Sequence, residues 1–217
     1  MADETRVQVL NEEGCRAQTQ SFMWLFRSGE DGLPAIILYG YSPTRSSSHA
    51  REFLEGYSGY LETDGYQGYN NLPGIRRCSC WAHIRRYFID AVPKGKQYDY
   101  SQPAVQGVQY CNRLFAIEDS INQKYPGDYE KRKQLRLKKE KPVLEPFWSW
   151  LDQQKPVRNT RMDKAINYVL NRRDTAETCL EDGRYSFTNN LNENAIRPFA
   201  VGRRNRLAVP WTERSKR

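Results

Sequence analysis

The chain has 217 residues, and its 34 lysines and arginines outnumber its 26 aspartates and glutamates, which gives a formal net charge of +8 at pH 7. This length suits one domain, or one domain with a sizeable insertion, and excludes a large multidomain machine. Aromatic residues make up 12% of the chain, enough to build an apolar core, so the composition does not suit a disordered protein. A basic chain of this kind has either no special partner or a polyanion partner, most often nucleic acid.

Membrane and secreted proteins are the next classes to be excluded. No apolar run approaches the roughly 18 residues of a membrane span, and the first ten residues lack the basic and apolar regions of a signal peptide. We therefore expect a cytoplasmic protein with no membrane partner. The five cysteines are odd in number and scattered, which predicts reduced thiols rather than a disulfide framework.

The first part of the chain reads as strands. Residues 5–10 alternate in polarity, and short apolar segments follow at 22–26 and 35–39 with turn-forming residues between them, which predicts an antiparallel meander. A short helix is expected at 51–57. A fourth strand at 60–66 stops at Asp64-Gly65, and a weak fifth strand covers 76–81.

Helices dominate the rest of the chain. Helical spacing of apolar residues predicts helices at 82–92, from about 105 to 121, at 142–151 and at 162–170, and a last helix opens near 192–199. Strands followed by helices, without an internal repeat, indicate an α/β or α+β domain that carries a helical insertion. Between two of the helices, residues 130–141 hold seven basic and two acidic residues. This basic run is either a solvated helical face or a surface for phosphate groups.

Three acidic residues stand where a metal site could form. Asp3 lies in the first strand pattern, Asp64 ends the fourth strand, and Glu193 lies in the predicted last helix. Carboxylates from two neighbouring strands and a helix can hold two Mg²⁺ ions roughly 4 Å apart for phosphodiester chemistry. Spacing alone is weak support, because 26 acidic residues offer many such triples.

Four motifs in register carry a more specific signal. They are Ala2-Asp3-Glu4-Thr5, the stretch from Tyr60 to Tyr69, the stretch from Cys80 to Phe88, and the stretch from Asn189 to Pro198 with Gly202-Arg203-Arg204-Asn205. In order and spacing, from Ala2 to about Asn205, the chain closely resembles the transposases of the insertion-sequence-66 family.

The resemblance implies a DDE transposase with a ribonuclease-H-like core, a mixed sheet flanked by helices. It implies Asp3, Asp64 and Glu193 as the catalytic, metal-binding acids, with two Mg²⁺ or Mn²⁺ ions as cofactors. The implied reaction is the cleavage and transfer of DNA strands at transposon ends. DNA is then the partner, acted on by a homo-oligomer, and no small-molecule substrate is expected.

The same resemblance implies the domain organisation. Residues 1–97 form the first part of the core, 98–170 a helical insertion, and 171–205 the last part of the core with the Glu193 helix, followed by an atypical basic tail at 206–217. Family members carry a DNA-end recognition region before the first aspartate and continue differently after Asn205. We therefore expect a chain truncated at both ends and inactive alone, with a tail that resembles out-of-frame translation.

Basic residues near the three acids are expected to contact DNA. His83, Arg85 and Arg86 follow the fifth strand, where either phosphate contact or a plain helix-surface role suits them. The resemblance also favours DNA-backbone contact by Arg197, Arg203 and Arg204. Cys78, Cys80 and His83 could bind zinc, but their spacing is poor and a fourth ligand is not evident, so a buried strand end is preferred for the cysteines.

Two other functions stay open. A non-catalytic DNA-binding remnant would use Arg203, Arg204 and the basic run, bind DNA with a steep salt dependence, and ignore chelators. A ribonuclease-H-like nuclease would share the metal site but need no defined DNA ends.

Overall fold

The computed structural model describes residues 1–9, 19–29 and 32–204, with side chains as far as Val201. Packing divides the chain into two compact units. The first unit holds residues 1–28, 34–75 and 189–217, and the second holds 29–33 and 76–188. The boundaries at residues 97 and 170 separate a catalytic core from a helical insertion rather than two packing units, and they stay a prediction. The tail at 206–217 lies outside the described residues.

The first unit is built on an antiparallel sheet of β1 (Ala2–Gln8), β2 (Gln20–Arg27) and β3 (Ile37–Ser42), with β2 in the centre. The register sets Asp3 opposite Leu25, and Leu25 opposite Tyr39. Strands β4 (Gly59–Thr63) and β5 (Ile75–Ser79) make a separate two-stranded sheet. The predicted meander and the α/β class are thus confirmed.

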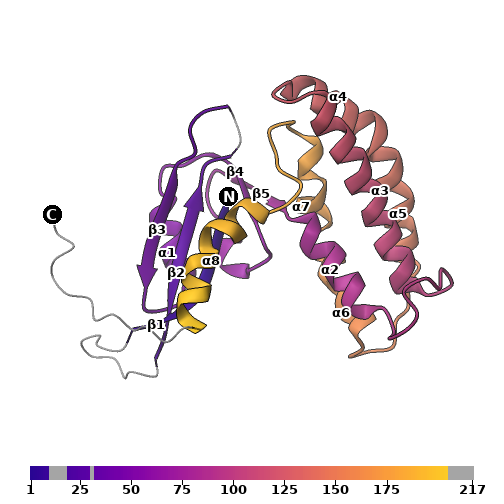
Figure 1. Cartoon of the computed structure of the whole chain (residues 1–217), viewed down its shortest axis with the longest axis horizontal. Coiled ribbons are helices and arrows are strands. Elements are labelled where there is room, and N and C mark those ends of the chain that lie inside the picture. Colours follow the sequence, from indigo (N-terminus) through magenta and orange to yellow (C-terminus); the bar gives the residue numbers. More distant parts are fainter. Residues whose placement is uncertain (10–18, 30–31, 205–217) are drawn as a thin grey trace. The chain divides into compact units, whose positions relative to one another are not determined.

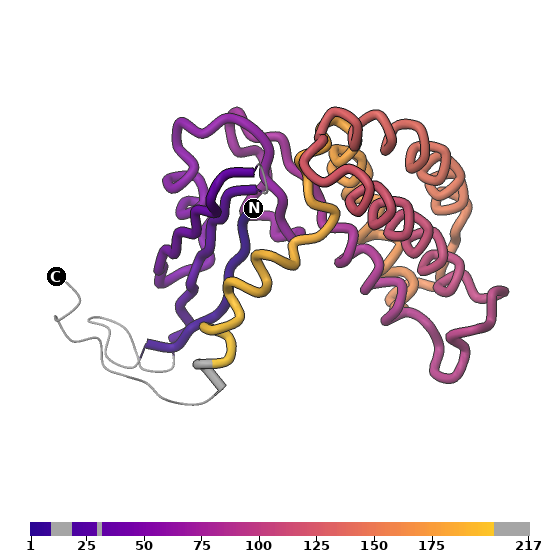
Figure 2. Tube along the Cα trace, turned by 45° about the horizontal axis from the view of Figure 1, so that its top comes forward, coloured from indigo at the N-terminus to yellow at the C-terminus, as the bar shows by residue number. Residues whose placement is uncertain are grey.

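Helices cover this sheet from chain segments that are far apart in sequence. Helix α8 (Asn190–Arg204) packs on β1 and β2, although almost the whole chain separates it from β1. Figures 1 and 2 both show this helix running beside the first strand. Helix α1 (Ser47–Phe53) packs against the short 3₁₀ helix η1 (Gln67–Tyr69).

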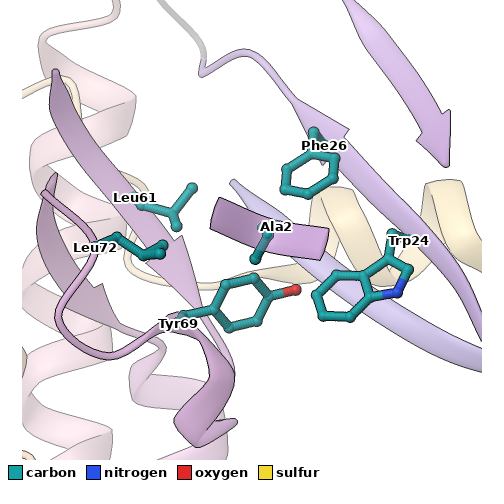
Figure 3. Packing of buried hydrophobic residues seen from close by; sticks show 7 residues of the cluster. Ala2, Trp24, Phe26, Leu61, Tyr69 and Leu72 are labelled. Atoms are coloured by element: carbon teal, nitrogen blue, oxygen red, sulfur yellow. The ribbon is translucent and has the colours of Figure 1, made fainter. Parts of the chain in front are cut away.

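A small aromatic core fixes the first unit. Trp24 of β2 is fully buried, with Tyr69 of η1 edge-on to it at a centroid distance of 5.7 Å. Figure 3 shows these two rings beside Ala2, the first residue of β1. The buried members of the core are Ala2, Trp24, Phe26, Ala50, Leu61, Tyr69 and Leu72. The core therefore ties β1 to the segment that follows β4.

The second unit is helical after β5. Helix α2 (Trp81–Ala91) packs on α3 (Pro103–Lys124) and α6 (Arg161–Leu170), and α4 (Tyr129–Lys139) and α5 (Lys141–Asp152) pack on each other and on α3, as Figure 1 shows. The short α7 (Arg173–Glu177) and the 3₁₀ helix η2 (Thr178–Leu180) complete it. Pro103 opens α3 in its first turn, where its missing N–H costs nothing. No helix in the described part of the chain is long and apolar enough to cross a membrane.

The observed elements follow the predictions with shifts at their ends. The first helix begins at Ser47 rather than at 51, because the Ser46 hydroxyl caps it by accepting a hydrogen bond from the Ser48 N–H. Helix α7 and both 3₁₀ helices were not predicted. Cys78 lies in β5 and Cys80 directly follows it, and both are buried, as preferred; neither they nor the other described cysteines, Cys111 and Cys179, form a disulfide with one another, and the latter two are also buried. Cys15 lies outside the described residues.

A buried arginine holds the second unit together. The Arg136 guanidinium is fully buried and donates to both carboxylate oxygens of Glu118, from Nε at 2.9 Å and from Nη2 at 2.6 Å. Its remaining N–H groups donate to the backbone carbonyls of Cys179, Asp182 and Tyr185. Arg136 therefore joins α3 and α4 to the loop beyond η2, with every side-chain nitrogen in a hydrogen bond.

Glu140 lies beside this pair and is also fully buried. Burial, together with the nearby Glu118 carboxylate, raises the pKa of Glu140 to about 9. Glu140 is therefore protonated in the folded protein at neutral pH, whereas it is ionised in the unfolded chain.

This difference gives the first prediction. Glu140 lowers the free energy of unfolding as the pH rises from its unfolded pKa of 4.5 toward 9, because the unfolded chain loses a proton that the folded one keeps. We expect Glu140→Gln to be more stable than the natural chain at pH 8, by at least about 1 kcal/mol, and equal to it near pH 4.5. Urea unfolding at both pH values measures this gain. The exposed Glu145→Gln on α5 is the control, and an equal pH dependence of Glu140→Gln and the natural chain would contradict the assignment.

Candidate functional site

Strand β1 carries two neighbouring carboxylates to opposite faces of the sheet. Asp3 pairs with Leu25 and Glu4 pairs with Trp24, and directly paired residues share a face while successive residues alternate. Glu4 thus lies on the face of the aromatic core. Asp3 lies on the other face.

Asp3 is in an acidic, poorly hydrated environment. The pKa of Asp3 is raised to about 7, first by burial and then by the negative charges of Asp64, Glu4 and Glu193, against a lowering by the Glu4 N–H, which donates to Asp3 Oδ1 at 2.8 Å. The charges of Asp64 and Glu193 thus act on Asp3, and the assignment of the three acids to one catalytic site stays a prediction. All three acids belong to the first unit.

Asp64 and Glu193 are held by local backbone structure. Asp64 directly follows β4, and its Oδ1 accepts the N–H groups of Gly65 and Tyr66, the latter at 2.8 Å, so the carboxylate fixes its own turn. Glu193 lies in the first turn of α8, where the helix dipole stabilises a negative charge. Its N–H donates to the Asn189 carbonyl at 3.0 Å, which places Asn189 at the start of the helix.

A polar network connects β1 to the turn that carries Asp64. The Glu4 side chain is 1% exposed, and its Oε2 accepts the Tyr69 hydroxyl at 2.7 Å. Its other oxygen, Oε1, accepts Arg45, whose Nε donates at 2.8 Å. The Arg45 guanidinium also lies 3.9 Å from the centroid of the Tyr66 ring, and the Tyr66 hydroxyl donates to the Arg45 carbonyl. The turn after β4 is thereby tied to β1.

The residue types of this site fit a divalent metal ion, but the present arrangement does not gather them. Carboxylates are the hard oxygen ligands that Mg²⁺ prefers, and mutual repulsion of the acids around Asp3 would be relieved by a cation. Asn192, next to Glu193, is fully buried, and its side-chain amide has no hydrogen-bond partner in the described structure, which is a costly state. Among residues 1–9, 19–29 and 32–204, however, no three His, Cys, Asp or Glu side chains are close enough to hold an ion.

The basic residues that the sequence singled out differ in their surroundings. Arg85 is used inside the second unit, where its Nε donates to Asn112 Oδ1 at 2.7 Å. His83 and Arg86 are on α2 in the same unit, and Arg86 is exposed. Arg197 is exposed on α8, one turn after Glu193. Arg203 and Arg204 end α8, and their side chains are not described.

Sequence reasoning missed the residues that support the acids. Glu4 stood inside the quoted first motif, and Tyr66 and Tyr69 inside the second, but none was given a role. Strand alternation could have pointed to Glu4, because it lies two residues after Ala2 and so shares its face of the strand. An acid on a buried face of a strand needs a partner. Arg45 lies in a loop and offered no comparable signal.

The chain was compared with known proteins. A sequence model described as "Transposase IS66 family" matches residues 1–216. The chain belongs to this family. Three proteins of Sinorhizobium fredii (strain NBRC 101917 / NGR234) are similar to it. Uncharacterized protein y4qI is 29% identical over 95% of the chain, y4hP is 29% identical over 97%, and y4jD is 28% identical over 81%. No solved structure matches.

The chain spans only part of these relatives. It covers 40% of the length of y4qI and of y4hP, and 35% of y4jD.

The Tyr69 hydroxyl gives the second prediction. A hydrogen bond to a buried carboxylate contributes about 1.5–3 kcal/mol, so Tyr69→Phe is expected to lower the free energy of unfolding by that amount while it keeps the ring in the core. Urea unfolding followed by circular dichroism measures the loss. Tyr57→Phe is the matched control, because the Tyr57 hydroxyl donates to the Tyr60 carbonyl from an exposed side chain. Equal stability of the two variants would show that Glu4 does not need the Tyr69 hydroxyl.

Proposed function

We propose that this chain is the catalytic part of a DDE transposase, in which Asp3, Asp64 and Glu193 hold divalent metal ions for the cleavage and transfer of DNA strands. The observation that carries the proposal is the coupling of three acids from three separate elements. Asp3 comes from β1, Asp64 from the end of β4 and Glu193 from the first turn of α8, and both of the others raise the pKa of Asp3. Family membership supports the same reaction.

The proposed core is ribonuclease-H-like. The antiparallel order β1-β2-β3, a strand ending at the second acid and a helix that brings the third acid back onto β1 support this assignment. Residues 98–170 are proposed as the helical insertion between the second and third acids. We expect the protein to act on chromosomal or plasmid DNA in the cytoplasm, as a homo-oligomer.

The roles of the chain's own residues follow from their positions. Asp3, Asp64 and Glu193 would hold Mg²⁺ or Mn²⁺, two ions in the proposed reaction. The ions, when bound, supply the charge that activates an attacking water or hydroxyl and steadies the leaving oxygen. The contacts among Glu4, Arg45 and Tyr69 hold the turn that carries Asp64 against β1. Arg197, Arg203 and Arg204 of α8 would contact the DNA backbone. His83 and Arg86 of α2 are proposed as further contacts to DNA.

A metal titration and a cleavage assay test the proposal together. Mn²⁺ is expected to raise the melting temperature of the natural chain, and Asp64→Asn to abolish that rise, because one of the three charged ligands is lost. With Mn²⁺ and a plasmid that carries the ends of the encoding element, the natural chain is expected to cut the DNA, and Asp64→Asn to cut it at least 100-fold more slowly.

The control for both measurements is Glu55→Gln, an exposed acid in the first unit that the proposed site does not use. A natural chain that gains no stability from Mn²⁺ would contradict the metal site. Cutting that survives Asp64→Asn would contradict the catalytic assignment of that residue. Metal-dependent cutting of DNA without the element's ends would instead favour a ribonuclease-H-like nuclease.

A second function is favoured by one observation. Because no three acidic, histidine or cysteine side chains in the described residues are gathered for a metal ion, a non-catalytic DNA-binding protein also suits the chain. It predicts DNA binding that is unchanged by a chelator, together with no cutting.

A further inference from the structure

The basic run at residues 130–141 divides into an inward and an outward set. Arg136 is fully buried and paired with Glu118, and Arg132 also reaches Glu118, from Nη2 at 3.4 Å. The two arginines of the run therefore serve the interior of the second unit. Of the five lysines in the run, Lys133 is half-buried and the other four are exposed.

Four exposed lysines form what we name the lysine ridge. Its members are Lys131, Lys138, Lys139 and Lys141. Lys131 and Lys138 are seven residues apart, so two turns of α4 bring them to the same side, whereas Arg136 and Glu140, four residues apart, share the buried side. The side-chain ammonium groups of these four lysines have no ion-pair or hydrogen-bond partner among the described residues.

The exposed acids next to the ridge in sequence are Asp128, Glu130 and Glu145, fewer than its four lysines. Glu130 is the only exposed acid in the run, and Gln134 donates to its Oε1 at 3.3 Å. Glu140 is buried and holds its proton at neutral pH, because burial and Glu118 raise its pKa to about 9. Of the two acids in the run, only Glu130 therefore brings a negative charge to the surface beside the ridge.

The helix that carries the ridge is firmly placed. Asp128 caps α4 by accepting the Lys131 N–H at 3.0 Å, and Arg136 fixes the middle of the helix to three carbonyls and to Glu118. A rigid helix presents its charges without the entropy cost of ordering a basic loop.

We propose that the lysine ridge, on α4 and the first residue of α5, is a docking surface for the phosphate backbone of double-stranded DNA. The assignment of DNA as the partner rests on the proposed function, because a transposase acts on DNA. Its chemistry is sequence-independent: lysine is a compact charge that contacts phosphate without reading bases. The ridge lies in the second unit, whereas Asp3, Asp64 and Glu193 belong to the first.

The salt dependence of DNA binding tests the ridge. Each phosphate contact adds about 0.9 to the slope of log K against log salt. Replacing all four ridge lysines by glutamine is expected to reduce that slope by about 2 to 4 and to weaken binding at least tenfold at ~0.1 M salt. The probe is a fluorescent 30-base-pair duplex of arbitrary sequence, and anisotropy is measured in EDTA so that no metal chemistry contributes.

The matched control changes the same net charge elsewhere. Lys94, Lys124, Lys155 and Lys164 are also exposed, and a variant with these four replaced by glutamine is expected to keep most of the affinity and slope. Circular dichroism melting checks that both variants are folded. An equal loss in the two variants would show a non-specific charge effect and overturn the proposal, as would an unchanged slope in the ridge variant.

Failure of the ridge and failure of the proposed function can be told apart. A loss of DNA affinity and salt slope in the ridge variant, measured in EDTA, supports the ridge even if Asp64→Asn has no effect on cutting or metal binding. A natural chain that binds no duplex DNA at low salt would overturn the ridge. A ridge-dependent preference for double-stranded RNA of the same length would reassign the surface to RNA and overturn the DNA proposal.

Discussion

The first unit depends on the burial of two adjacent carboxylates on one strand. An ionised carboxylate is expensive to remove from water unless it is paired, and β1 removes both Asp3 and Glu4, one on each face of its sheet. The cost of burying the Glu4 carboxylate is offset by hydrogen bonds from the Arg45 guanidinium and the Tyr69 hydroxyl. Asp3 has other acids as neighbours and only a backbone N–H to lower its pKa. The two faces of β1 therefore differ: Glu4 is paired on one face, and Asp3 on the other is the acid of the proposed metal site.

The second unit also buries two acids, Glu118 and Glu140, and their pKa values shift in opposite directions. Glu118 is buried as deeply as Glu4, but Arg136 surrounds it with two hydrogen bonds and holds its pKa below the usual value, against the effect of burial. The adjacent Glu140 has no such partner and keeps its proton instead. A buried acid is thus either paired, protonated or chemically useful. Asp3 is the acid for which we propose the last of these, because acids of three different elements raise its pKa.

Much of this fold is readable from local sequence, because strand alternation and helical spacing are local signals. The meander, helices α2, α3, α5 and α6, and the placing of Asp3, Asp64 and Glu193 on β1, after β4 and on α8 agree with the predictions, whereas α7 was not predicted. The helix at Ser47 was predicted a turn too late, because its start depends on the Ser46 hydroxyl rather than on an apolar period. The network of Glu4, Arg45 and Tyr69 could not be predicted, since it joins residues up to 65 positions apart and no periodicity signals such a contact.

The basic run shows why a formal charge count is a poor guide to a surface. Its two arginines have the planar, multidentate head group that a buried carboxylate and several carbonyls require, and both point inward. Its exposed lysines have a strongly hydrated head group that resists burial, so they stay on the surface. Substituting Arg136 by lysine would leave the formal charge unchanged but would lose most of five hydrogen bonds. Residue type, rather than charge, therefore decides which part of the run builds the protein and which part is left to meet a partner.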